Sequence, residues 1–122
     1  MIQPQELRIG NYVFDIDGDV LQIGQILDIG VKFKNTSLSS RYEKIQPIPL
    51  TEKILFKFGF EKQHNEDDFD YWFKKGFCDD ILWEHSEGFC HSLNYGGDIK
   101  YVHQLQNLFF SLCGEELTFK KD

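Results

Sequence analysis

The sequence predicts an α+β fold: a small N-terminal SH3-like β-barrel unit, then a helix, a three-stranded antiparallel meander and a C-terminal helix. Three observations predict it. Short alternating apolar segments separated by turn residues fill residues 7–46, apolar residues recur at helical spacing around 51–59 and 98–114, and three aromatic segments lie between those helices. Residues 1–50 are expected to form the β unit, and residues 51–122 an α-β-β-β-α unit packed against it in one globule.

The N-terminal unit is predicted to contain four or five short strands joined by tight turns. Asp17-Gly18 is a hairpin signal, and Asp28-Ile29-Gly30 marks a second turn. Residues 35–41 are polar and are expected to form a loop. The expected strands cover residues 7–14 with a bend at Gly10-Asn11, 19–27, 31–34 and 42–48.

The first predicted helix has clear ends. Thr51 can accept backbone N–H groups as N-cap, and Leu50 before it can pack on Leu55 as a hydrophobic staple. Gly59 can adopt the left-handed conformation that ends a helix. The sequence therefore predicts a helix of about two turns, which depends on tertiary packing for its stability.

The second predicted helix lies near the end of the chain. Asp98 is the expected N-cap and Gly114 the expected left-handed end. Its apolar residues recur at three- and four-residue steps and share one face: Val102, Leu105, Leu108, Phe109 and Leu112.

The aromatic segments between the helices are expected to pair as an antiparallel meander. They cover residues 69–74, 81–85 and 89–95, with a turn at Ser86-Glu87-Gly88. Residues 117–119 are expected either to add a short edge strand or to pack onto the core.

Composition places the chain among soluble, cytoplasmic proteins. An apolar fraction of 41% allows a real core and argues against disorder. Three cysteines at irregular spacing fit reduced thiols better than a disulfide framework. The N-terminus shows no signal peptide, and no apolar run approaches the ~20 residues that span a bilayer. No membrane association is expected.

Negative charge is concentrated in one window. The chain has a net charge of −7, and residues 61–91 hold nine acidic residues against three lysines. Such a surface repels phosphate backbones and attracts a basic groove, although ordinary solubility charge is the plain alternative. The expected partner-binding residues are Glu66, Asp67, Asp68, Asp70, Tyr71, Trp72, Asp79, Asp80, Trp83 and Glu84.

No pattern predicts catalysis, a metal or a cofactor. Asp15-Ile16-Asp17-Gly18-Asp19 resembles a calcium loop only superficially, because glycine is its fourth residue and the twelfth position is Ile26. A hairpin turn is the better interpretation. Four residues of zinc-ligand type lack the short spacings of zinc sites: Cys78, Cys90, His91 and His103.

Three blocks of the sequence resemble a family of small bacterial proteins encoded by phages and mobile elements. The blocks are LRIGNYV at 7–13, IPLTE at 48–52 with FGF at 58–60, and YVHQLQNLFF at 101–110 with GEEL at 114–117. Residues 61–97, which contain the whole acidic window, fall outside the resemblance. The family has no general activity, so the resemblance implies no catalytic residue.

The resemblance implies a genomic setting in which small accessory proteins often act on host defences. Some such proteins resemble anti-CRISPR inhibitors, including inhibitors of type VI RNA-guided ribonucleases. Our first hypothesis is a non-enzymatic protein whose acidic aromatic surface docks on such a nuclease or its ribonucleoprotein. No direct DNA binding is expected, and the sequence does not specify the oligomeric state. The alternative is a regulatory or housekeeping module that binds DNA or a phage protein through the N-terminal unit, using Arg8, Lys32, Lys34, Arg41 and Lys44.

Overall fold

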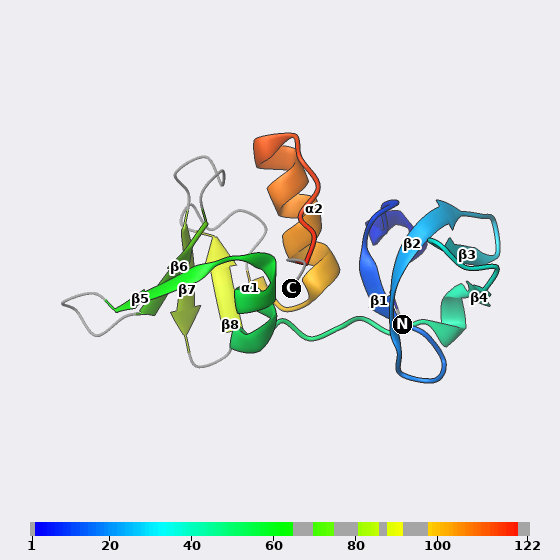
Figure 1. Ribbon diagram of the computed structural model, residues 1–122, viewed down its shortest axis with the longest axis horizontal. Coiled ribbons are helices and arrows are strands. Elements are labelled where there is room, and N and C mark those ends of the chain that lie inside the picture. The colour runs from blue at the N-terminus through cyan, green and yellow to red at the C-terminus, as the bar shows by residue number, and fades with distance from the viewer. Residues whose placement is uncertain (1, 65–69, 75–80, 86–87, 92–97, 120–122) are drawn as a thin grey trace. The chain divides into compact units, whose positions relative to one another are not determined.

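The computed structural model describes residues 2–64, 70–74, 81–85, 88–91 and 98–119, without the side chains of residues 81, 83, 85, 88 and 91. The fold is α+β, with two antiparallel sheets and two α-helices in the described residues (Figure 1). Neither of these helices combines the length and the apolar character needed to cross a membrane.

The chain divides into two compact units, each of which is described by itself. Unit 1 comprises Met1–Pro49 with Tyr101–Asn107, and unit 2 comprises Leu50–Lys100 with Leu108–Asp122. Helix α2 (Val102–Cys113) therefore contributes its first half to unit 1 and its second half to unit 2.

Unit 1 contains a curled four-stranded antiparallel sheet with strand order β1-β2-β3-β4 (Figure 1). A register shift between Ile23 and Gln25 interrupts the pairing of β2 with β3. Its elements are the 3-10 helix η1 (Pro4–Glu6), β1 (Tyr12–Phe14), β2 (Val20–Ile26), β3 (Gly30–Phe33), β4 (Ser39–Arg41) and the 3-10 helix η2 (Tyr42–Lys44).

The predicted strands at 19–27 and 31–34 are confirmed by β2 and β3, but the segment after them differs from the prediction. The expected loop at 35–41 contains β4, which has no apolar side chain and is held by backbone pairing to β3. The prediction of a strand at 42–48 is wrong. This segment begins with the 3-10 helix η2, and Gln46 forms an isolated bridge with Phe14.

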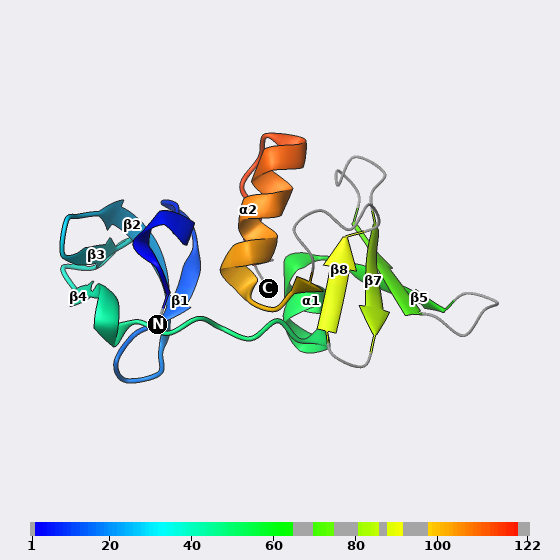
Figure 2. The same ribbon diagram turned by 180° about the vertical axis from the view of Figure 1, so that it is seen from behind.

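Unit 2 contains α1 (Glu52–Phe58) and a five-stranded antiparallel sheet with strand order β5-β6-β7-β8-β9. The neighbouring strands β7 and β8 run in opposite directions (Figure 2). The strands are β5 (Glu61–His64), β6 (Asp70–Phe73), β7 (Ile81–His85), β8 (Gly88–His91) and β9 (Asp98–Ile99).

The predicted ends of α1 are confirmed. The Thr51 hydroxyl accepts a hydrogen bond from the backbone N–H of Ile54 at 3.3 Å, which satisfies one of the open donors of the first turn. Gly59 ends the helix with a φ of 94°, the left-handed region that glycine enters without steric cost. This helix is therefore bounded by local chemistry.

The predicted start of the second helix is wrong. Asp98 lies in β9 and pairs with Cys90 of β8, so it is not an N-cap. The helix begins four residues later at Val102, where Gln104 Oε1 accepts the backbone N–H of Tyr101 at 3.1 Å. The expected left-handed end at Gly114 is confirmed by its φ of 72°.

The predicted three-stranded meander corresponds to β6, β7 and β8, but the sheet is wider. Strand β5 was not predicted because all four of its residues are polar and exposed, so no apolar alternation marks it. Its pairing with β6 fixes it in the sheet.

Each unit has its own apolar core. Residues 117–119 were expected either to form an edge strand or to pack onto the core, and they pack onto the core of unit 2. Leu117 is buried, and the Phe119 ring stacks on the Phe58 ring with 4.6 Å between their centroids. The unit 1 core is Ile2, Leu7, Val13, Ile23, Val31, Phe33, Tyr42 and Ile45. Buried apolar residues of unit 2 include Leu55, Phe58, Phe60, Trp72, Leu82, Phe89, Ile99, Phe109 and Leu117.

Candidate functional sites

A charged cluster centred on Lys62 lies on unit 2. Its ammonium group contacts the carboxylates of Glu52 at 2.5 Å and Asp70 at 3.3 Å. His64, two residues along β5, places Nδ1 2.7 Å from the other Asp70 oxygen. Glu84 is paired directly opposite Asp70 across β6 and β7. We call these five residues the Lys62 cluster.

The lowered pKa values of Glu52 and Asp70 keep these two carboxylates of the cluster charged at neutral pH. The hydrogen bond from His64, supported by Lys62, lowers the pKa of Asp70. The hydrogen bond from Lys62 lowers the pKa of Glu52, and the same bond raises the pKa of Lys62. Counting His64 as neutral, three carboxylates face one ammonium group, so the cluster is acidic.

The predicted aromatic contact Trp72 is wrong. Its side chain is fully buried, and its indole N–H donates to Glu84 Oε1 at 2.8 Å. Because successive side chains of a strand point to opposite faces, Trp72 faces the core while Tyr71 and Phe73 do not share its side. Phe56, whose ring meets the Trp72 ring edge-on at 4.9 Å, is an exposed aromatic residue beside the cluster that sequence reasoning missed.

The other predicted contact residues fall into two groups. Asp70, Tyr71 and Glu84 are half-buried on β6 and β7. Five of the remaining six lie outside the described residues: Glu66, Asp67, Asp68, Asp79 and Asp80. The sixth is Trp83, whose backbone in β7 is described but whose side chain is not.

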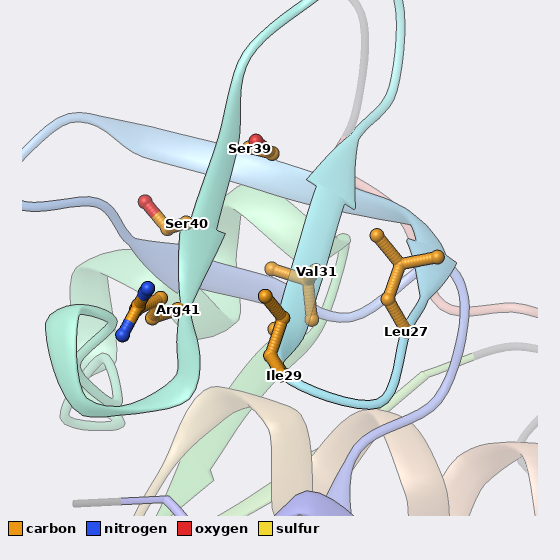
Figure 3. A pocket seen from close by; sticks show the side chains of 7 residues that line it. Leu27, Ile29, Val31, Ser39, Ser40 and Arg41 are labelled. Carbon is orange, nitrogen blue, oxygen red and sulfur yellow. The ribbon is translucent and has the colours of Figure 1, made fainter.

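A pocket of about 230 Å³ lies on unit 1, beside the turn that joins β2 to β3. Apolar side chains come from that turn and from β3, whereas β4 supplies hydroxyl groups and a guanidinium group (Figure 3). The pocket is lined by Leu27, Ile29, Gly30, Val31, Ser39, Ser40 and Arg41.

The five basic residues of the alternative hypothesis differ in their surroundings. The Arg8 guanidinium donates to Asn107 Oδ1 at 3.2 Å, which ties it to α2. The other four are exposed in the segment from β3 to η2: Lys32, Lys34, Arg41 and Lys44.

Buried amide groups join the first half of α2 to β1 within unit 1. Gln106 Oε1 accepts the Tyr12 backbone N–H at 2.8 Å, and Gln106 Nε2 donates to the Gly10 carbonyl at 2.9 Å. Asn11 Nδ2 donates to Asn107 Oδ1 at 3.0 Å. Sequence reasoning missed this network, although Gln106 stands one turn from Val102 on the apolar face of the helix and could have been recognised there.

His103 is a buried histidine of unit 1 with an unusual environment. It is 1% exposed, and neither ring nitrogen has a hydrogen-bond partner within the described residues. The Glu6 carboxylate lies 4.0 Å from Nε2, and the Tyr101 ring stacks on the imidazole. Burial lowers the pKa of His103, and Glu6 opposes this in part.

This burial predicts that acid destabilises the protein through His103. Because the folded-state pKa lies below the unfolded value near 6.5, the stabilisation is complete above pH 6.5 and is lost as the pH falls toward the folded pKa. Urea unfolding between pH 7.5 and pH 5 should show a falling midpoint in the native chain and a smaller fall in His103→Leu. Equal slopes in the two proteins would contradict the prediction.

The acidic loop before β2 is a hairpin turn, as predicted. Asp15 Oδ1 accepts the backbone N–H groups of Asp17 and Asp19, both at 2.9 Å, and Gly18 has a φ of 82°. The three carboxylates have oxygens within 4.8 Å of one another, so they could approach a common cation. The Asp15 oxygen already serves the turn, and the other two side chains are exposed.

Cys90 does not have the environment of an activated nucleophile. Burial, followed by the nearby Asp98 carboxylate, raises the pKa of its thiol above its ordinary value. A raised pKa lowers the fraction of thiolate at neutral pH, so the thiol is poorly reactive.

Comparisons with known protein families, curated proteins and solved structures gave no match to this chain. The candidate sites are therefore interpreted from their own chemistry.

Proposed function

We propose that this chain is a non-enzymatic, cytoplasmic accessory protein of a phage or mobile element that binds and inhibits a host RNA-guided ribonuclease. The observation that supports this proposal most directly is the charge of residues 61–91, where nine acidic residues oppose three lysines. An acidic surface of this kind favours docking on a basic groove that otherwise holds RNA.

The described part of this window supports an electrostatic mode of binding. Strand β5 is exposed along its whole length, and the lowered pKa of Asp70 keeps its carboxylate charged. Glu52 lies outside the window but contacts Lys62 of β5, and its pKa is lowered as well. With Trp72 in the core, Tyr71 and the exposed Phe56 remain as aromatic candidates for the contact.

We further propose that unit 1 is an SH3-like barrel. Its four short strands are followed by η2, and Gln46 after η2 pairs antiparallel with Phe14 of β1 through two hydrogen bonds of 3.0 Å. A segment that returns from the last strand to the first is what closure of a small barrel requires. This assignment concerns the scaffold and leaves the function of unit 1 open.

Neutralising the acidic window is expected to weaken the complex. The variant carrying Asp67→Asn, Asp68→Asn and Asp70→Asn should bind a guide-loaded type VI ribonuclease about tenfold more weakly at 50 mM salt, because three attractive charges are lost. Calorimetric titration of purified components measures this change. The native complex should also weaken between 50 and 500 mM salt.

The matched control removes three exposed acids of unit 1, with Asp17→Asn, Asp19→Asn and Asp28→Asn. It makes the same change in net charge and should bind as the native chain does. Unchanged affinity and inhibition in the first variant, with its melting temperature intact, would refute the role of the acidic window.

A further inference from the structure

We infer that the pocket of unit 1 binds an extended peptide segment of a partner protein, in which aliphatic and acidic side chains alternate. The pocket belongs to the β2–β3 turn and β4, whereas the proposed nuclease contact belongs to unit 2. The inference therefore goes beyond the proposed function and can be tested separately from it.

The apolar side of the pocket is available to a ligand. Ile29 is 67% exposed and Leu27 is 40% exposed, while Val31 beneath them is fully buried. Ile26 at the end of β2 and Leu38 in the segment between β3 and β4 are also exposed. Transfer of one aliphatic side chain from water into such a site contributes about 1.5–3 kcal/mol, which is enough to anchor a short peptide segment.

The wall of the pocket is held in place before any ligand arrives. Leu27 donates its backbone N–H to Gly30 O at 2.8 Å, and the Tyr42 hydroxyl donates to Leu27 O at 2.5 Å. The backbone N–H of Tyr42 also donates to Ile29 O at 3.3 Å. Because these bonds fix the turn at Leu27 and at Ile29, the turn loses little conformational entropy when a ligand binds.

The neighbouring strand favours a ligand in extended conformation. Within the described residues β4 is the last strand of its sheet, and no further strand pairs with its outer edge. Ser39 and Ser40 are small polar residues that leave a peptide backbone room to approach. Because alternate side chains of an extended segment face the same side, only every second residue of the ligand needs to be aliphatic.

Charge selects the other residues of the ligand. The Arg41 side chain at the pocket is 69% exposed, and its guanidinium lies 4.0 Å from the carboxylate of Glu43, whose side chain is 54% exposed. Residues 26–44 contain four basic and two acidic residues, a net charge of +2 in a chain of −7. Guanidinium groups bind carboxylates through paired hydrogen bonds. Arg41 and the two serines could contact either a carboxylate or a phosphate, but the apolar side of the pocket gives a phosphate backbone no partner, so a peptide fits better than DNA.

Fluorescence anisotropy with synthetic nonapeptides tests the inference on the full chain. A fluorescein-labelled peptide of alternating leucine and glutamate should bind. Peptides of alternating serine and glutamate, or of alternating leucine and lysine, should bind at least about tenfold more weakly, because each lacks one of the two complementary features.

Two substitutions on the protein should reproduce these effects. Ile29→Ser removes apolar surface and should raise the Kd for the peptide about tenfold. The control Ile16→Ser changes an isoleucine of nearly equal exposure, 66%, that lies outside the pocket, and should leave the Kd unchanged. Arg41→Gln should weaken binding and reduce its salt dependence, and Lys53→Gln on α1 should do neither.

Three outcomes would overturn the inference. They are binding that ignores the leucine residues, equal losses in Ile29→Ser and Ile16→Ser, and a 20-base-pair DNA duplex that binds in an Arg41-dependent way while the leucine–glutamate peptide does not. None of these outcomes depends on the ribonuclease, so failure here leaves the proposed function standing.

Discussion

Gly30→Ala is expected to lower the free energy of unfolding by about 3 kcal/mol. A methyl group at this position would lie 2.0 Å from the Ser40 carbonyl oxygen and 2.8 Å from Arg41 Cα. Both atoms belong to the β4 backbone, so no side chain can rotate away. Strands β3 and β4 would have to separate, which breaks their pairing and opens the peptide pocket. Urea unfolding followed by far-ultraviolet circular dichroism measures the loss.

Gly24→Ala on β2 is the matched control. There the added carbon would lie 3.0 to 3.2 Å from atoms of Lys34, one of which belongs to a flexible side chain. A shift of a few tenths of an ångström relieves this contact, and the expected loss is about 1 kcal/mol. If the two variants proved equally stable, the close approach of β3 and β4 at Gly30 would be wrong.

Gly30→Ala should also abolish binding of the leucine–glutamate peptide, because Gly30 and Arg41 are directly opposite each other in the register that builds the pocket. Gly24→Ala should retain binding. This comparison separates a folded pocket from a nonspecific apolar surface.

The parts of the fold that could be predicted from sequence are those fixed by local chemistry. Thr51, Gly59 and Gly114 act within one helical turn, so their roles follow from residue type and spacing alone. The same holds for the hairpin at Asp17-Gly18. Partners distant in the sequence are not needed to explain these residues.

The parts that could not be predicted are held by distant backbone partners. Strands β4 and β5 carry no apolar pattern, and only pairing with β3 and β6 makes them strands. Asp98 has the residue type of a helix cap, but pairing with Cys90 places it in a sheet. Local residue patterns indicate such strand pairing too weakly for it to be predicted from the sequence.

The candidate sites show the same division. The acidic character of residues 61–91 follows from composition, but the burial of Trp72 depends on which face of β6 meets the core. The pocket on unit 1 depends on the pairing of Gly30 with Arg41, and no residue pattern marks it. Binding surfaces built by strand register are thus the features that needed the structure.

Gln106→Leu is expected to destabilise the protein by about 2–4 kcal/mol, although leucine suits a buried helix position better than glutamine does. The Gln106 side chain is fully buried, accepts from the Tyr12 backbone N–H and donates to the Gly10 carbonyl. Leucine would fill a similar volume but would remove both bonds, and the part-buried Tyr12 N–H would lose its acceptor at a cost in desolvation.

Gln25→Leu, at an exposed position of β2, is the control and should change stability by no more than about 0.5 kcal/mol. Chemical denaturation of both variants gives the comparison. If Gln106→Leu matched or exceeded the native stability, the first half of α2 would be held within unit 1 by apolar packing alone. The expected loss would instead show that the amide bonds to β1 fix the position of the first half of the helix. The amphipathic pattern of the helix specifies only which of its faces is buried.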